Sequence, residues 1–358
     1  RRGDEVKIEL DIPPDTNSTF LQWFHFRVLN AKAQRLRITF PNAHKSSYAA
    51  AWNGYKMRYS EAGGPWLQIA RTSYDDGTLC ALITPQSNLL SIAYFAPYSL
   101  HRHQQLIQRS IKNNCEYQSL GHSVQQRSID LLTIGTGARP WWIIARQHPG
   151  ETMAEWWMEG LIEGLTDRHN SVAQRLLERV TFYLVPNMNP DGSQLGNLRT
   201  NAAGANLNRE WLEPSLERSP EVYWTRQKML HTGVDFCLDV HGDETLPYNF
   251  IAGLEGIPSC TPELLNAQHA FMGELLRACP DFQTVHGYEL DAPGTANLGV
   301  ASNYIAETFS CVALTLEQPF KDTIDAPVPA TGWSPERAKE FGKSTIIAMW
   351  NWLIQRSQ

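Results

Sequence analysis

Long apolar runs and an excess of basic residues are both missing from this chain. No hydrophobic stretch approaches the about 18 residues that a helix needs to cross a bilayer. The 31 Lys and Arg residues stand against 37 Asp and Glu residues, which gives a formal net charge of −6. This balance provides no basic surface for nucleic acid or for an anionic membrane. We therefore expect neither of them as a partner.

Paired cysteines and an apolar N-terminal segment are also lacking. The six cysteines form no CxxC pair, and their scatter over 358 residues predicts reduced thiols and a cytoplasmic location. Arg1 to Asp4 are not followed by an apolar segment, so we expect no secretory signal. Composition leaves the oligomeric state open.

The first hundred residues carry the pattern of a β-domain. Short runs rich in β-branched and aromatic residues are separated by Pro, Gly, Asn or Asp. They cover residues 6–12, 22–29, 35–40, 55–59, 66–71, 78–84 and 89–95. This spacing predicts an antiparallel β-sandwich over residues 1–103, with no catalytic constellation inside it.

Strands alternate with helices in the remaining chain, residues 104–358. The apolar run 141–146 is typical of a strand buried on both faces, and helical spacing follows over residues 152–165. A cap residue, a proline and an acid stand in order at 219–221, 261–263 and 334–336, as at helix starts. We predict a three-layer α/β/α domain with a mixed sheet and helices on both faces.

Polar residues follow three of the predicted strands. In open α/β sheets, ligand sites gather at the carboxyl ends of strands. His148 and Glu151 follow the strand that ends at residue 146, while His241 and Glu317 end two later strands. The HxxE spacing lets an imidazole and a carboxylate reach one metal ion. A distant His completes the His₂Glu set of catalytic zinc sites, which leaves one position for water.

Neither the HxxE pair nor the arginines of the next loop are specific alone. His241 and Glu244 form a second HxxE, and such pairs are often only hydrogen-bonded loop residues. The segment 189–192, Asn-Pro-Asp-Gly, is typical of a tight turn. Arg199 and Arg209 lie in the loop-like stretch that follows. A guanidinium suits bidentate capture of a carboxylate, but surface arginines are common.

Five segments in order resemble the zinc carboxypeptidases, and more narrowly their cytosolic carboxypeptidase branch. They are His148-Pro-Gly-Glu151, Asn189-Pro-Asp-Gly192, Leu207-Asn208-Arg209-Glu-Trp211, Asp239-Val-His241-Gly and Thr315-Leu-Glu317. Segments 22–28 and 97–100 resemble parts of the β-sandwich that precedes the catalytic domain in that branch. The resemblance covers essentially the whole chain.

The resemblance implies a zinc-dependent carboxypeptidase that acts on the C-termini of proteins or peptides. One zinc ion would be bound by His148, Glu151 and His241. Glu317 matches the general base, which activates the attacking water and returns a proton to the leaving amine.

Three further residues match the substrate-binding groups of the family. Arg199 matches the arginine that polarises the scissile carbonyl, and Asn208 with Arg209 matches the pair that binds the terminal carboxylate. Asn206, however, stands where the family pattern has an Asp that orients a ligand histidine. Because an amide raises ligand basicity less than a carboxylate, we expect weaker zinc binding unless an acid such as Asp239 helps.

The side chain removed from the substrate is not fixed by these motifs. Eukaryotic members of the branch remove glutamates and place basic residues upstream of the catalytic Glu. Here residues 242–310 contain Arg277 and no other Lys or Arg. Either Arg209, His286 or a residue from elsewhere pairs with a glutamate side chain, or the enzyme is not strict for glutamate.

Two other functions fit the same residues. Deacylases of N-acyl amino acids share the HxxE…H zinc site, although the preceding β-sandwich and the Asn208-Arg209 pair favour a carboxypeptidase. The second alternative is a binding or scaffold protein that keeps the fold without turnover. Competent side chains at all three ligand positions and at Glu317 argue against it.

Overall fold

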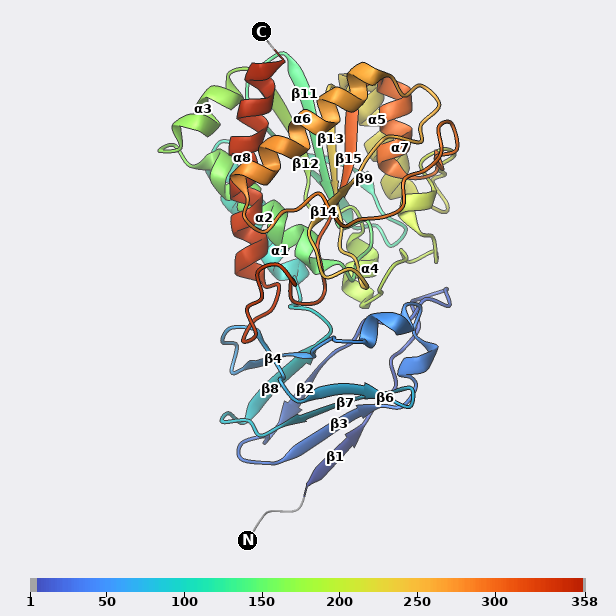
Figure 1. The fold of residues 1–358 in the computed structure, drawn as a ribbon, viewed down its shortest axis with the longest axis vertical. Coiled ribbons are helices and arrows are strands. Elements are labelled where there is room, and N and C mark those ends of the chain that lie inside the picture. Colours follow the sequence, from blue (N-terminus) through green and yellow to red (C-terminus); the bar gives the residue numbers. More distant parts are fainter. Residues whose placement is uncertain (1–4, 357–358) are drawn as a thin grey trace.

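The computed structural model describes residues 5–356. Arg1 to Asp4, on which the expectation of no secretory signal rests in part, lie outside the described residues. The N-terminal strands form one end of the molecule and the α/β domain forms the other, with the two chain ends far apart (Figure 1). None of the helices within residues 5–356 is long and apolar enough to cross a membrane.

The N-terminal part is the predicted sandwich of two four-stranded sheets. Their strand orders are β1-β3-β7-β6 and β2-β8-β4-β5. All pairings are antiparallel except β1 with β3, which is parallel. The strands are β1 (Val6–Glu9), β2 (His25–Leu29), β3 (Leu36–Phe40), β4 (Arg58–Glu61), β5 (Leu67–Gln68), β6 (Thr72–Asp75), β7 (Thr78–Ile83) and β8 (Leu89–Ala93).

Strand β6 was absent from the sequence prediction. Its four residues contain one aromatic side chain and bury only Thr72, so they lack the apolar pattern of the other strands. The strand pairs with β7 through a two-residue turn in which Asp76 and Gly77 have φ values of 49° and 78°. Such positive values are typical of tight hairpins.

Seven strands form the central mixed sheet of the second part. The order is β14-β15-β13-β11-β12-β10-β9, with parallel pairing from β15 to β12 and antiparallel pairing at both edges. The mixed sheet is therefore confirmed. The strands are β9 (Glu116–His122), β10 (Ser128–Ile134), β11 (Arg139–Ala145), β12 (Val180–Val185), β13 (Phe236–Val240), β14 (Phe250–Ala252) and β15 (Val312–Glu317).

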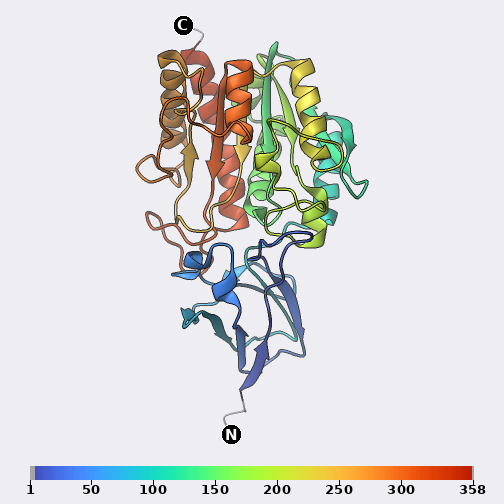
Figure 2. The ribbon, with the colours of Figure 1, turned by 90° about the vertical axis from the view of Figure 1, so that its right-hand side faces the viewer.

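Helices cover both faces of this sheet (Figures 1 and 2). They are α1 (Leu100–Lys112), α2 (Thr152–Thr166), α3 (Ser171–Leu177), α4 (Pro190–Leu195), α5 (Pro220–Thr232), α6 (Pro262–Ala278), α7 (Ala301–Phe309) and α8 (Pro335–Gln355). The three predicted helix starts are confirmed in α5, α6 and α8. The boundary after residue 103 stays a prediction, since α1 begins at Leu100.

The tight turn predicted at residues 189–192 is wrong, because these residues begin α4. The side-chain oxygen of Asn189 accepts a hydrogen bond from the N–H of Gly192 at 3.0 Å, and Pro190 occupies the first helical position. Turn residues are also good helix-capping residues, so the local sequence is compatible with both structures.

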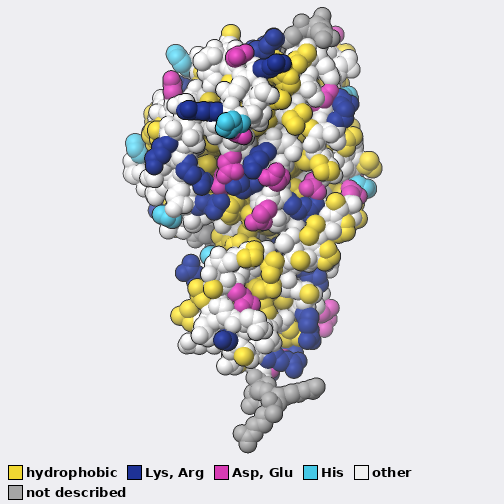
Figure 3. Space-filling view, turned by 90° about the vertical axis from the view of Figure 1, so that its left-hand side faces the viewer, with side chains coloured by type: hydrophobic (Ala, Val, Ile, Leu, Met, Phe, Trp, Pro, Cys, Tyr) yellow, Lys and Arg dark blue, Asp and Glu magenta, His cyan; other side chains and the backbone are white. Residues whose placement is uncertain are grey.

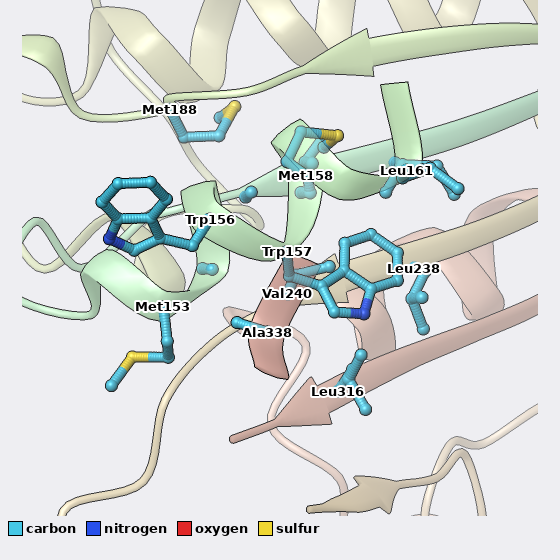
Figure 4. Packing of buried hydrophobic residues seen from close by; sticks show 14 of the residues in the cluster. Met153, Trp156, Trp157, Met158, Leu161, Met188, Leu238, Val240, Leu316 and Ala338 are labelled. Atoms are coloured by element: carbon cyan, nitrogen blue, oxygen red, sulfur yellow. The ribbon is translucent and has the colours of Figure 1, made fainter. Parts of the chain in front are cut away.

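Helix α2 is held rigidly between the sheet and α8. Trp157 packs beside Leu238, Val240 and Leu316 of the strands (Figure 4). A Cβ atom on Gly160 would come within 2.0 Å of the carbonyl oxygen of Lys339, so the two helices cross in close contact. This packing fixes the start of α2, where one of the candidate metal ligands lies.

A buried ion-pair network supports the same end of α2. His103 lies 2.6 Å from Glu155 and 2.9 Å from Asp130, and Arg146 donates to Glu155 at 2.6 Å. Arg146 also donates to the carbonyl oxygen of Pro149 at 3.0 Å. The network therefore ties α1, β10 and α2 to the loop that follows β11.

We predict that this network makes the stability depend on pH. Although burial favours the neutral ring, Glu155 and Asp130 raise the pKa of His103 to about 9. Its stabilising effect is therefore complete below the unfolded pKa of about 6.5 and is lost as the pH rises through about 9, at most about 3 kcal/mol. Urea unfolding at pH 7 and pH 10 should show a larger loss for the native chain than for His103→Gln. Equal losses would contradict the assignment.

Neither the surface charges nor the cysteines indicate a further partner or a disulfide within the described residues. Figure 3 shows Lys and Arg side chains interspersed with Asp and Glu on one face of the molecule. All six cysteines lie within the described residues and are free. The cytoplasmic location stays a prediction.

Candidate active site

Three candidate ligands meet at the carboxyl ends of β11 and β13. His148 follows β11, Glu151 precedes the first residue of α2, and His241 follows β13 directly. Nδ1 of His148 lies 2.7 Å from Oε1 of Glu151, and Nδ1 of His241 lies 2.8 Å from its Oε2. The two Nδ1 atoms are 3.1 Å apart, and all three side chains are buried.

The chemistry of these donors fits a zinc ion. Burial and Arg199 lower the pKa of His148 to about 4, so this ring is a neutral ligand. Burial alone would lower the pKa of His241, but Asp239 and Glu151 raise it well above the usual range. A cation between Glu151 and the two rings would replace the proton held there. Zinc bonds of about 2.0–2.1 Å in tetrahedral geometry separate donors by about 3.3 Å. The donors found here, 2.7–3.1 Å apart, would therefore move apart by a few tenths of an ångström to bind the ion.

Each histidine is oriented through its second ring nitrogen. Nε2 of His148 lies 3.0 Å from Oδ1 of Asn206, and Nε2 of His241 lies 2.8 Å from Oδ2 of Asp239. Asp239 also accepts from Gln147 at 2.6 Å. The neutral amide of Asn206 therefore contacts His148. The carboxylate of Asp239, which was expected to compensate for the missing Asp at position 206, contacts His241 instead.

We predict that Asn206→Asp tightens zinc binding. A carboxylate at this place would raise the basicity of His148, and changes of such partners typically alter metal affinity by about 10- to 100-fold. The variant retains an oxygen for the N–H of Asn208, which Asn206 accepts at 3.1 Å. Competition with a fluorescent zinc chelator would measure the dissociation constants. Tighter binding by the native chain would refute this account of residue 206.

Glu317 ends β15 and faces the same cleft. Its side chain is 7% exposed, and its Oε2 has no hydrogen-bond partner among the described residues. Without the charge of a metal ion, burial raises the pKa of Glu317 to about 8, although His241 acts in the opposite direction. A buried carboxyl group with a free oxygen is well suited to proton transfer.

The cleft also contains the three remaining residues of the sequence prediction. It has a volume of about 900 Å³ and is lined by Arg199, Asn208 and Arg209 together with the ligands His148 and Glu151. Nη1 of Arg199 lies 3.9 Å from Oε1 of Glu151. The side-chain oxygen of Asn208 accepts from the N–H of Ala301 at 2.8 Å. Its amide group is thereby oriented by the start of α7.

The second HxxE does not form a separate metal site. His241 belongs to the group described above, whereas Glu244 lies in the cleft outside it. Glu244 is buried, and its Oε1 has no hydrogen-bond partner among residues 5–356.

Arg277 lies on α6, pairs with Glu274 and does not line the cleft. His286 does line it and stacks on Tyr248 with ring centroids 4.3 Å apart.

Residues of the sandwich at this site were missed by the sequence analysis. Tyr48, from the sandwich part, lines the cleft. The ring centroids of Tyr48 and Phe20 lie 5.5 Å and 5.7 Å from Cζ of Arg199. No motif in the sequence connects Phe20 or Tyr48 with the distant loop that carries Arg199, so the sequence pattern could not have identified these two aromatic residues.

The chain is similar to known carboxypeptidases over nearly its whole length. The family profile of the cytosolic carboxypeptidase N-terminal domain matches residues 1–95, and that of the zinc carboxypeptidases matches residues 100–236. A metallo-carboxypeptidase structure from Pseudomonas aeruginosa is 46% identical, covers 98% of this chain and 94% of its own, and superposes with a TM-score of 0.95. One from Burkholderia cenocepacia is 42% identical over 97% of this chain and 93% of its own, also with a TM-score of 0.95.

A eukaryotic relative is similar over a shorter part. Mouse cytosolic carboxypeptidase 6 is 30% identical over 70% of this chain, which spans about half, 52%, of the length of that protein. The first profile names the cytosolic carboxypeptidase branch, the second names the zinc carboxypeptidases, and the similar metallo-carboxypeptidase structures cover nearly the whole chain. The chain belongs to the zinc carboxypeptidase family, in its cytosolic carboxypeptidase branch, and is a metallocarboxypeptidase.

Proposed function

We propose that this chain removes the C-terminal residue of peptides or proteins, with each cleft residue in the role that its position supports. The observation that carries the proposal is a buried His₂Glu ligand group beside a cleft that a buried carboxyl group and two arginines line. His148, Glu151 and His241 would hold zinc. When bound there, zinc supplies a Lewis acid and lowers the pKa of water.

Glu317 is the proton carrier of the reaction. Its free Oε2 takes a proton from the water that attacks the scissile carbonyl and then delivers it to the leaving amine nitrogen. The products are a carboxylate and a free amino acid, so the atoms of one water are added across the peptide bond. Arg199, next to Glu151, stabilises the negative charge that develops on the carbonyl oxygen.

Asn208 and Arg209 restrict the reaction to the end of the chain. Arg209 donates to the backbone carbonyl oxygen of Asn208 at 2.6 Å, and both residues line the cleft wall. A guanidinium beside an amide binds a carboxylate through several charge-assisted hydrogen bonds. A substrate whose terminal carboxylate lies there presents its last peptide bond to the metal site.

The remaining charge in the cleft does not favour a glutamate side chain. Among the described residues, no Lys and no Arg besides Arg199 and Arg209 line the cleft. Once Arg209 binds the terminal carboxylate, a substrate glutamate would have no free cationic partner. Carboxylates other than Glu151 and Glu317 also line the cleft, namely Asp243, Glu244, Glu255, Glu289 and Asp291.

Among these carboxylates we propose Glu255 as the one that meets a substrate side chain. In the register of β14 and β15, Phe250 pairs with Glu317 and Ala252 with Thr315. Glu255 follows β14 in the sequence, three residues after Ala252. It lines the cleft, and its carboxylate accepts a hydrogen bond from the side-chain amide of Gln268 at 2.5 Å. A cationic or neutral side chain suits this wall, whereas an acidic one would be repelled.

A ligand of a related protein has matching chemistry. The Pseudomonas aeruginosa structure is a complex with (2-guanidinoethylmercapto)succinic acid, which carries a guanidino group and carboxylates. Carboxylates suit Arg199 and Arg209, and a guanidino group suits an acidic wall. This supports the proposal that C-terminal Lys, Arg or neutral residues are removed in preference to glutamate.

A peptide panel tests this preference. We predict that peptides ending in Lys or Arg are cleaved with kcat/KM at least about 10-fold above the same peptides ending in Glu, the order expected for one charge contact. Glu255→Gln, which keeps an oxygen for Gln268, should reduce the ratio several-fold. Mass spectrometry of the digests gives both numbers. A preference for Glu would show that a cation from outside the cleft pairs with it.

Adding N-acyl amino acids to this panel separates the carboxypeptidase from the two alternatives, a deacylase and a scaffold protein. An N-acyl amino acid offers a terminal carboxylate and one amide bond, so a deacylase would cleave it much faster than a peptide. A scaffold without turnover would bind zinc and cleave neither. We expect peptides to be the better substrates, because the cleft of about 900 Å³ is open to a longer chain.

A further inference from the structure

The loop that carries Arg199 has internal hydrogen bonds around Asn201, but the backbone N–H groups of residues 198–200 have no acceptor inside the loop. Residues 196–206, between α4 and the short helix η3 (Leu207–Arg209), contain no helix or strand. The N–H groups of residues 198–200 therefore need acceptors from elsewhere. The position of the Arg199 side chain therefore depends on what binds this backbone.

The sandwich provides those acceptors through one buried carboxylate. Asp15 is 5% exposed and accepts hydrogen bonds from the backbone N–H groups of Leu198 at 2.5 Å, Arg199 at 2.8 Å and Thr200 at 2.9 Å. The hydroxyl of Thr200 donates to it as well, at 3.1 Å. Charged acceptors of backbone N–H groups form strong hydrogen bonds, so Asp15 fixes three consecutive residues.

Neighbouring residues extend the same contact. The N–H of Thr16 donates to Oδ1 of Asn197 at 3.0 Å, and the side chain of Asn17 donates to the carbonyl oxygen of Ala202 at 2.9 Å. Gly204 has a φ of +77°, and a Cβ atom there would come within 2.2 Å of the carbonyl oxygen of Asn17. The two segments are therefore in close contact. Figure 2 shows the N-terminal loops against the base of the α/β domain.

Aromatic rings of the sandwich also confine the guanidinium. Phe20 and Tyr48 lie beside it, and no hydrogen bond from the guanidinium is present within residues 5–356. Its nearest carboxylate oxygen, Oε1 of Glu151, is 3.9 Å away. The donors of Arg199 thus stay free for a substrate oxygen, while rings on the sandwich side restrict where they point.

We propose that the β-sandwich is a positioning element of the active site: Asp15 holds the backbone of Arg199, and Phe20 with Tyr48 holds its guanidinium. The inference rests on the proposed role of Arg199 at the scissile carbonyl. Donors fixed before the reaction stabilise the oxyanion without reorganising. A displacement of about 1 Å caused far from the chemistry can cost about 10²-fold in rate.

Hydrogen exchange and kinetics of Asp15→Asn test the proposal together. In the zinc-loaded variant, we expect faster amide exchange in a peptide that covers residues 198–200. We also expect kcat to fall by about 10- to 100-fold, with KM within about 3-fold and an unchanged zinc content. Gln68→Ala is the matched control, since it removes a sandwich hydrogen bond to Pro329 of the α/β domain, outside the Arg199 loop. It should leave exchange and kcat unchanged.

A double-mutant cycle separates positioning from general destabilisation. In an Arg199→Ala background, Asp15→Asn should change kcat by less than about 3-fold, because its effect acts through Arg199. Phe20→Leu, a milder variant, should show the same dependence if Asp15→Asn folds poorly. Unchanged exchange at residues 198–200, or an equal loss of kcat in both backgrounds, overturns the proposal. Native kcat in Arg199→Ala would instead refute the proposed role of Arg199, while the exchange still reports whether Asp15 holds the loop.

Discussion

Glu317→Gln should lower kcat by about 10²- to 10⁴-fold while the protein keeps its zinc. The amide has nearly the same shape as the carboxyl group but cannot take a proton from water. Because general acid–base catalysis contributes about 10²- to 10⁴-fold, kcat should fall by that factor.

The control for this variant is its metal content and its affinity for a product. Glu317 is not among the three clustered ligand residues, so the zinc stoichiometry should equal that of the native chain. A C-terminal amino acid should inhibit or bind both proteins equally. If Glu317→Gln keeps more than about a tenth of native kcat, another group carries the proton and the assignment is wrong.

Removal of the metal should cause a loss of similar size. Dialysis against a chelator leaves His148, Glu151 and His241 without the cation that their close donors need. The Lewis acid is then missing, and turnover should drop below about 1% of the native value. Stoichiometric Zn²⁺ should restore it, whereas Glu151→Gln should bind zinc weakly and stay inactive after the same addition. Full activity after verified metal removal would contradict a metallocarboxypeptidase mechanism.

The sequence predicted those parts of the molecule that carry a local pattern, such as hydrophobic periodicity or helix-start residues, or a set of motifs in a fixed order. The alternation of strands and helices after residue 104 has strong periodicity, and helices α5, α6 and α8 begin where cap, proline and acid stand together. His148, Glu151, His241 and Glu317 were identified because they end or follow strands whose carboxyl ends meet at one sheet edge. The structure places His148, Glu151 and Glu317 in one cleft, and His241 is clustered with the first two of them.

Contacts between residues far apart in the chain could not be predicted from the sequence. Asp15 and Arg199 are separated by 184 positions, and nothing in either neighbourhood marks them as partners. The contribution of Asp239 is similar in kind: it could be proposed as a compensating acid, but its contact with His241 instead of His148 depends on how β13 ends. Strand β6 and helix α4 show a further limit, because short polar segments fit several local structures.

The metal ligands and the substrate-binding residues are assigned from different observations. The metal group rests on the proximity of three buried donors in the structure, and the family assignment rests on both parts of the chain. The roles of Arg199, Asn208 and Arg209 rest on their shared cleft and remain proposals. The selectivity rests on the sign of the charges that line it.

The most direct measurement is a time course of one peptide and its C-terminally amidated twin, both followed by mass spectrometry with the zinc-loaded protein. An exopeptidase whose Asn208 and Arg209 bind a terminal carboxylate should shorten the free peptide by single residues from its C-terminus. The amidated twin should stay intact over the same period, since it lacks that charge. Internal cleavage, or equal cleavage of both peptides, would contradict the account.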